Sequence, residues 1–365
     1  MIYKLVRVST RSYRRVFVLL LLCLLLYFAN WLYSYIIDFY VPTMQPQPVR
    51  KDMSNMPVIS GQEHFIPSLI EPVVSEDNLF ILVLINSAAG SESHFQKRMA
   101  IRKTWGKPII GHKKWKIAFF LGKTNKRLTD EKRLMEAKQY GDIIIGDFPD
   151  TYRNITQKLM MAFKWTSKIN YKYLLKTDDD VYVNIPLLIT WINGRLHPNE
   201  PLYAGVLYRA KIIRDPSHRH FVRWSDLPQQ SYPWYPKGAL YVLSSDVVQE
   251  MLKIVSRVKM ITVDDAYVGV LASYVGVRPV YLNGFIQWGF LPELVELFDR
   301  CTYSNIIGMA DNMSPDDIYF VHQEVTSLQN SSKWMCIHVS HPILATVGLV
   351  IFLLLVLYTN RHKLI

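Results

Sequence analysis

The chain has 365 residues, 50% of them hydrophobic and 20% charged, with a formal net charge of +12 at pH 7. This length allows one large domain or two small ones with some shorter segments. The positive charge does not indicate a nucleic-acid partner, because the sequence contains no recognition motif and no basic helix. Much of the excess flanks two apolar runs near the chain ends, and the remainder favours a phosphorylated ligand or an anionic surface.

Two apolar runs predict membrane spans. Residues 16–37 exceed the roughly 20 residues that a helix needs to cross a bilayer, and they lack a clear small-residue cleavage site. We therefore expect an uncleaved signal anchor that follows a basic cytosolic tail at residues 1–15. Residues 343–358 predict a second span. We assign residues 341–365 to this span together with the basic cytosolic tail that follows it. A cleaved lipid-anchor tail and a buried core helix are the alternatives for this second run.

A stretch rich in proline follows the first apolar run. Residues 38–77 show no clear apolar period, which is typical of an extended stem, and we expect this stem in the lumen. Two cysteines outside the first span, Cys301 and Cys336, can pair in an oxidising lumen. Three N-glycosylation triplets agree with a lumenal location and begin at Asn154, Asn312 and Asn330.

Strands and helices alternate in the folded part, which we place at residues 78–340. Continuous apolar runs, as expected for central parallel strands, occur at residues 79–85, 115–122, 142–146 and 173–177. Helical patterns lie between them, at residues 95–105, 129–140 and 156–169. The later elements are expected at residues 186–192, 202–208, 240–243, 246–255 and from residue 263 onward. This alternation predicts an α/β fold with a doubly wound sheet.

Three adjacent carboxylates stand directly after one of these predicted strands, at Asp178, Asp179 and Asp180. A buried strand that ends in clustered acids places them at the edge of a sheet, where ligand crevices form in open α/β folds. The acids repel one another, and a hard divalent cation such as Mg²⁺ or Mn²⁺ offsets that repulsion. The alternative is a solvated acidic turn, but the flanking strands favour a site.

Three further groups of residues are candidates for binding or chemistry. Arg98 and Arg102 share one face of a predicted helix, either as a fork pair for a phosphate or carboxylate or as a solvated basic face. Residues 232–239 form an aromatic loop whose rings either stack on a sugar or cover the core. Asp264 and Asp265 begin a helix, where they either take part in chemistry or complement the helix dipole.

Seven motifs, in order along the chain, resemble the β-1,3-galactosyltransferase family, which is glycosyltransferase family 31. The motifs are RMAIRKTWG from Arg98, FLG from Phe120, DFPDTYRNITQK from Asp147, KTDDDVYVN from Lys176, YPWYPKG from Tyr232, DDAYVG from Asp264 and VHQ from Val321. The likeness covers residues 78–323. Each motif alone is weak evidence. Because all seven occur in the same order, the chain is identified as a member of this family.

The resemblance implies a GT-A fold with a Rossmann-like sheet, anchored in the Golgi membrane with a lumenal catalytic domain. It implies an inverting transfer of a hexose to a glycan acceptor on a glycoprotein or glycolipid in β-1,3 linkage, with Mn²⁺ as cofactor. Galactose from UDP-galactose is the leading donor, and UDP-N-acetylglucosamine is the alternative. A catalytically silent glycan-binding or chaperone protein on the same fold is the alternative from another class.

The resemblance also implies roles for individual residues. The expected general base for the acceptor hydroxyl is Asp265, with Asp264 as the alternative. The expected metal ligands are Asp178, Asp180 and His322. The residues expected at the donor are Arg98, Arg102, Lys158 and Asp179. The residues expected at the acceptor are Tyr232, Trp234, Tyr235 and Gly238.

The chain departs from the family pattern at several positions. Pro236 replaces a cysteine of the aromatic loop, so that Cys301 loses its usual partner, and Lys237 and Ala239 also differ there. Ala266 replaces a valine beside the expected base, and the second apolar run has no counterpart in the family's ordinary single-anchor layout. These departures bear on the identity of the acceptor more than on activity.

Overall fold

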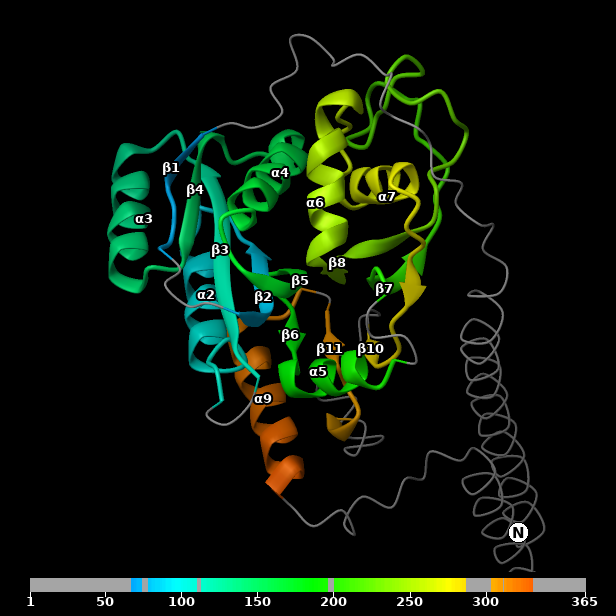
Figure 1. Cartoon of the computed structure of the whole chain (residues 1–365). Helices are drawn as coiled ribbons and strands as arrows, with labels where there is room; N and C mark the ends of the chain where they lie inside the picture. Colours follow the sequence, from blue (N-terminus) through cyan, green and yellow to red (C-terminus); the bar gives the residue numbers. More distant parts are fainter. Residues whose placement is uncertain are drawn as a thin grey trace, which may run out of the picture. The chain divides into compact units, whose positions relative to one another are not determined.

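A mixed sheet of eight strands forms the centre of the described part of the chain (Figure 1). The computed structural model describes residues 67–73, 78–109, 113–195, 200–286, 303–310 and 312–330, all within one compact unit, Pro46–Lys333. In spatial order the strands are β1 (Ser68–Ile70), β4 (Ile143–Pro149), β3 (Trp115–Lys123), β2 (Leu79–Asn86), β5 (Tyr171–Asp178), β8 (Tyr235–Ser244), β7 (Tyr203–Tyr208) and β9 (Val280–Tyr281).

The strands β4, β3, β2 and β5 run parallel, while β8 runs antiparallel to β5. In the register of the sheet, Asn86 at the end of β2 lies beside Asp178 at the end of β5. Thr177 of β5 pairs with Leu240 of β8, so the first residues of β8 lie at the same edge. The carboxyl edge of the parallel strands therefore gathers residues from three parts of the chain, as expected for a ligand site in an open α/β sheet.

Helices cover both faces of this sheet (Figure 1). One face packs against α4 (Ile155–Thr166), α6 (Ser245–Ile254) and α7 (Asp264–Tyr274). The other face packs against α2 (Glu92–Lys103), α3 (Arg127–Tyr140), α5 (Ile185–Asn193) and α9 (Pro315–Asn330). Short elements complete the description: the single turns η1 (Tyr152–Asn154) and η2 (Val255–Arg257), and a small sheet of β6 (Tyr182–Val183), β10 (Phe285–Ile286) and β11 (Gly308–Met309).

The sequence of β2 explains why the sheet is buried on both faces. Side chains alternate between the faces of a strand, so a strand covered on both sides needs apolar residues throughout. Leu82 and Leu84 belong to the core cluster on the α4 side, whereas Val83 and Ile85 belong to the cluster on the α2 side. The predicted α/β fold with a mostly parallel central sheet is thus confirmed.

Two predicted segments differ from the structure. The stem was expected to reach residue 77 as an extended tether, but Ser68–Ile70 form β1, which pairs antiparallel with β4 and is itself the edge strand of the sheet. The aromatic loop was expected to end before residue 240, but β8 already begins at Tyr235 and pairs with β7 there. In both cases a strand from a distant part of the chain supplies the backbone partner, which local sequence patterns do not reveal.

Several sequence predictions lie outside the described residues. They are the cytosolic tail, both predicted spans, most of the stem and the pairing of Cys301 with Cys336. Within the residues that the structure does describe, none of the helices combines the length and the apolar character that a bilayer crossing requires.

The position of β2 predicts the cost of truncating its side chains. Leu82 is fully buried, so Leu82→Ala should lower the free energy of unfolding by about 2–5 kcal/mol, as leucine truncations in packed cores do. Leu128→Ala is the matched control, because Leu128 on α3 is 74% exposed and should cost less than about 0.5 kcal/mol. Equilibrium denaturation of the purified chain measures both values. Equal, small effects would contradict the burial of β2.

Candidate active site

Lys176 lies at the centre of the acidic edge of the sheet. Its ammonium donates to Asp178 Oδ1 at 2.9 Å and to the carbonyl oxygen of Gly238 at 2.6 Å, and it lies 3.8 Å from Asp264 Oδ2. Burial acts to lower the pKa of Lys176, but the charges of Asp178 and Asp264 outweigh it and raise that pKa. Lys176 is therefore a buried cation that joins β5, the start of β8 and the first turn of α7.

Asp265 stands beside this cation in the first turn of α7. The backbone N–H of Gly238 donates to Asp265 Oδ2 at 2.9 Å, and the N–H of Ala266 donates to Oδ1 at 2.7 Å. Burial and the neighbouring charge of Asp264 raise the pKa of Asp265 to about 7. A carboxylate whose pKa lies near neutrality is suited to accept a proton from a substrate hydroxyl.

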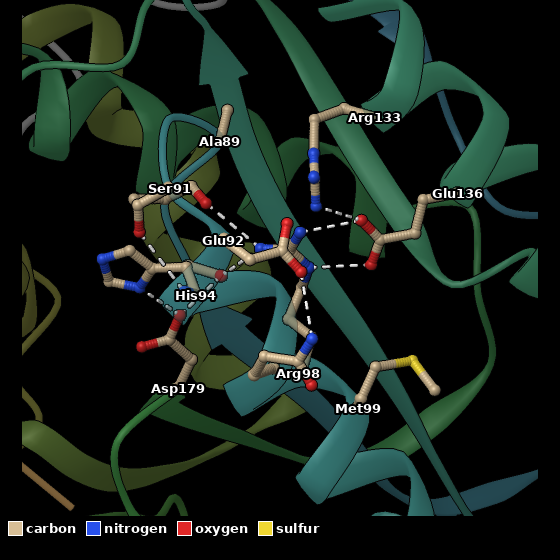
Figure 2. Close-up of polar contacts among 12 residues, drawn as sticks. Ala89, Ser91, Glu92, His94, Arg98, Met99, Arg133, Glu136 and Asp179 are labelled. Atoms are coloured by element: carbon tan, nitrogen blue, oxygen red, sulfur yellow. Dashed lines mark hydrogen bonds and ion pairs between the residues drawn. The ribbon is translucent and has the colours of Figure 1, made fainter. Parts of the chain in front are cut away.

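Asp179, the middle acid of the triplet, is held by two neighbours. Ser87 Oγ donates to Asp179 Oδ2 at 2.6 Å, and Nδ1 of His94 lies 2.7 Å from the same oxygen. Figure 2 shows the His94 ring turned toward this carboxylate. A carboxylate can only accept, so Nδ1 carries the proton in this contact. Asp179 was predicted at the donor, and the structure places it in a buried hydrogen-bonded position behind the site.

Asp180 faces a different basic side chain. Lys97 Nζ, on α2, lies 3.7 Å from Asp180 Oδ2. Burial and the charge of Asp178 raise the pKa of Asp180, although Lys97 opposes them. Each acid of the triplet thus has its own basic neighbour, and two of these neighbours, His94 and Lys97, lie on α2.

Arg98 and Arg102 share one helix face as predicted, but both point at carboxylates of this chain. Arg98 donates to both carboxylate oxygens of Glu136, at 2.9 and 2.7 Å, and Arg102 donates to Glu136 at 2.9 Å and to Asp142 at 2.8 Å. Arg133 also donates to Glu136, as Figure 2 shows. The fork geometry that we expected toward a donor is occupied by protein groups, so a donor-binding role for the two arginines stays a prediction that this geometry does not favour.

This arginine cluster supports the loop after β2. Arg98 donates to Ser87 Oγ at 2.8 Å and to the carbonyl oxygen of Ala88, while Lys158 donates to the carbonyl oxygen of Ser87 at 2.9 Å and to Asp150 at 2.8 Å. Lys158 was also expected at the donor, and here it ties the β2 loop to the end of β4. Both cations hold the loop from which Ser87 reaches Asp179.

The oxygen atoms at the acidic edge fit a hard divalent cation. Asp178 and Asp180 are close enough to raise the pKa of Asp180 by repulsion, and a divalent ion relieves such repulsion. Asn86 donates from Nδ2 to Asp178 Oδ1 at 3.3 Å, and its own amide oxygen is buried with no hydrogen-bond partner among the described residues. An amide oxygen without a partner, on a side chain that contacts the Asp178 carboxylate, is consistent with Mg²⁺ or Mn²⁺.

His322, the third expected metal ligand, contacts a tyrosine and not the acid triplet. His322 Nδ1 is 3.3 Å from the Tyr182 hydroxyl, and burial lowers the pKa of this histidine. In the described ranges, no three or more histidine, cysteine, aspartate or glutamate side chains gather to hold a metal. The role of His322 as a ligand therefore stays a prediction without support from this geometry.

Two aromatic rings that were expected at the acceptor are more buried than their sequence suggested. Tyr232 and Tyr235 were expected to present exposed faces for a sugar, but they are only 4% and 3% exposed and pack edge-to-face at 6.0 Å in the core. Tyr235 packs against Gly269 of α7, so an acceptor role for the two rings stays a prediction that their burial does not favour. Trp234 between them stays partly exposed, and Gly238 instead supports Lys176 and Asp265 through its backbone.

The N-glycosylation triplets differ in access. Asn312 is exposed, whereas Asn154 is half-buried and donates from its side chain to the carbonyl oxygen of Pro149. Thr156, the third residue of the first triplet, is buried. The side chain of Asn330 lies outside the described set.

Sequence analysis did not single out His94, Lys97, Lys176 or Asn86. One signal could have found Lys176, because residues two apart on a strand point to the same face and Lys176 precedes Asp178 by two. No local signal reveals His94 and Lys97, since their contact with the triplet depends on how α2 packs over the end of β5.

Comparisons with known proteins agree with this arrangement. Residues 96–283 match the sequence model of a family described as Galactosyltransferase. The "Beta-1,3-galactosyltransferase 1" of Mus musculus is 29% identical over 262 residues, which cover 70% of this chain and 77% of that protein. "Beta-1,3-galactosyltransferase 9" of Homo sapiens is 29% identical over 275 residues, or 74% and 70% of the two chains. A "Lactosylceramide 1,3-N-acetyl-beta-D-glucosaminyltransferase" of Xenopus tropicalis is 28% identical over 264 residues, or 69% and 67%.

The buried arginine cluster predicts a large cost for removing its shared carboxylate charge. Glu136→Gln leaves Arg98, Arg102 and Arg133 without their common counter-charge. The free energy of unfolding should therefore fall by about 3–5 kcal/mol. Glu131→Gln is the matched control, because it breaks only the exposed Arg127–Glu131 pair and should cost less than about 1 kcal/mol. Denaturant titration compares the two variants. Similar stabilities would show that Glu136 does not hold the cluster together.

Proposed function

The chain belongs to the galactosyltransferase family, whose sequence model covers just over half of its 365 residues, and on this premise we propose an inverting β-1,3-hexosyltransferase. In this proposal it moves a hexose, galactose from UDP-galactose in the leading case, to a glycan acceptor. The observation that carries the proposal is Asp265, a half-buried carboxylate that the Gly238 N–H holds next to Lys176 and whose pKa is raised to about 7. The family also leads us to assign the sheet to the GT-A class.

In the proposed reaction, Asp265 takes the proton of the acceptor hydroxyl. The hydroxyl oxygen then forms a bond to the anomeric carbon on the face opposite the leaving group. The bond from that carbon to the diphosphate oxygen breaks, and UDP departs with the electron pair. The N–H groups of Gly238 and Ala266 fix the orientation of the Asp265 carboxylate. Lys176 tempers the rise in the pKa of Asp265, so that the base is partly ionised near neutral pH.

Asp178 and Asp180 are the side chains that would hold Mn²⁺. When bound, the ion supplies positive charge that stabilises the diphosphate as it leaves. The chain's own contribution is the placement of these acids by β5 and by the hydrogen bonds of Lys176 and Asn86 to Asp178. This support fixes where the donor's phosphates come to lie relative to Asp265.

A β-1,3-N-acetylglucosaminyltransferase is the second candidate. It is favoured by the Xenopus tropicalis relative, whose name states that activity. A catalytically silent glycan-binding protein is the third, and the presence of Asp178, Asp180 and the Asp264–Asp265 pair argues against it. Turnover on either UDP-sugar separates the first two candidates from the third.

We also propose that the enzyme works in the Golgi, held in the membrane with its catalytic domain in the lumen. The support comes from the sequence: the apolar run at residues 16–37, the basic residues before it, and the N-glycosylation triplets. The second apolar run, at residues 343–358, would place the C-terminus in the cytosol. Protease access to a C-terminal tag in intact organelles tests that orientation.

Transfer by the purified full-length chain tests the proposed function. UDP release should appear with Mn²⁺, one UDP-sugar and a suitable member of a mixed glycan panel, and it should depend on the acceptor. Asp265→Asn should lower that turnover by about 10²- to 10⁴-fold while UDP binding persists, because the base acts only in the chemical step. Asp246→Asn is the matched control, since Asp246 is an exposed acid in the first turn of α6.

Two results would count against this account. UDP binding without turnover on any acceptor from the native glycans would favour the silent protein. Full turnover by Asp265→Asn would remove Asp265 as the base and leave Asp264 as the alternative.

A further inference from the structure

Lys97 has a largely buried side chain, and its ammonium has no hydrogen-bond acceptor among the residues that the structure describes. Its side chain is only 9% exposed, and its one ion pair, to Asp180 Oδ2, is 3.7 Å long. Within the described ranges, Lys97 makes no shorter polar contact. An ammonium has three protons to donate, and at Lys97 none of them has a protein acceptor within hydrogen-bond distance among the described residues.

The other two acids of the triplet already have close partners. Asp179 Oδ2 accepts a hydrogen bond from Ser87 Oγ at 2.6 Å and lies 2.7 Å from His94 Nδ1. Asp178 accepts from Lys176 at 2.9 Å, and Lys176 makes its remaining contacts inside the protein. Lys97 is therefore the cation at the triplet that retains spare hydrogen-bonding capacity.

The exposure of the triplet indicates what a ligand would meet. The side chains of Asp178 and Asp180 are each 30% exposed, whereas Asp179 is 5% exposed. A ligand that approaches the triplet from solvent thus meets Asp178 and Asp180 first. The cation beside Asp178 is Lys176, whose side chain is 2% exposed. The cation beside Asp180 is Lys97, whose side chain is 9% exposed and therefore the more accessible of the two.

We propose that Lys97 is a donor-binding residue that hydrogen-bonds the diphosphate of the nucleotide-sugar. This inference rests on the proposed function, since it names a residue of the same donor site. A diphosphate is repelled by three carboxylates, and an ammonium beside them offsets that repulsion. Turning from Asp180 to a phosphate oxygen would cost Lys97 no hydrogen bond, because the present ion pair is longer than one.

Binding measurements on the full-length chain test this role. Titration calorimetry with Mn²⁺ present compares UDP with uridine, which lacks the phosphates. Lys97→Met keeps the length of the buried stem and removes the charge, so UDP affinity should fall by about 10- to 100-fold, the range of a hydrogen bond to a charged group. Uridine affinity should stay unchanged. Lys97→Gln, which removes the charge but keeps a polar end, is the second variant and should behave in the same way.

The matched control is Lys103→Met, because Lys103 lies in the last turn of the same helix and is exposed. It should bind UDP as the unaltered chain does. UDP affinities of both Lys97 variants within twofold of the unaltered chain would show that Lys97 only packs against Asp180. Equal losses for UDP and uridine would also overturn the proposal, since the effect would not involve phosphate. An unaltered chain that binds neither compound would contradict the proposed nucleotide-sugar activity itself, and the role of Lys97 with it.

Discussion

The buried ammonium of Lys176 is the interaction on which the candidate active site depends. A lone charge inside a protein is strongly unfavourable, and Asp178, Asp264 and the carbonyl oxygen of Gly238 offset its cost. These partners come from β5, β8 and α7. One cation therefore links the acids that would serve the donor to the acid pair that would serve the acceptor, in addition to the pairing of β5 with β8 and the hydrogen bond from the Gly238 N–H to Asp265.

A second buried charge cluster supports this arrangement from behind. Glu136 on α3 accepts hydrogen bonds from Arg98, as Figure 2 shows, and from Arg102, both on α2. Arg98 also donates to Ser87 Oγ, and Ser87 donates to Asp179. Buried ion pairs are weak sources of stability, but hydrogen bonds on several sides hold a group in one geometry, as Glu136 and Ser87 hold the guanidinium of Arg98. The arginines thus act on the acid triplet through the loop after β2.

Much of the fold could be predicted because β2, β3, β4 and β5 are continuous apolar runs, and such runs separated by helical patterns leave few alternatives to a parallel sheet. The acid triplet was also visible, since it directly follows β5. The contacts of Lys97 and His94 with that triplet could not be predicted, because they depend on the packing of α2 against a strand more than 70 residues away. The burial of Tyr232 and Tyr235 could not be predicted for a related reason: an aromatic ring beside prolines suits a sugar or a core equally well, and the pairing of Tyr235 with Tyr208 of β7 joins distant parts of the chain.

The most direct test of the account is the pH dependence of kcat/KM for the unaltered chain and for Lys176→Gln. Asp265 must be ionised to accept a proton and its pKa is raised to about 7, so activity should fall as the pH drops below about 7. Lys176 opposes the rise in that pKa, and removing its charge should move the acidic limb to higher pH. If kcat/KM of Lys176→Gln falls but the pH at which its acidic limb begins is unchanged, the claim that Lys176 links the acid triplet to the Asp264–Asp265 pair is contradicted.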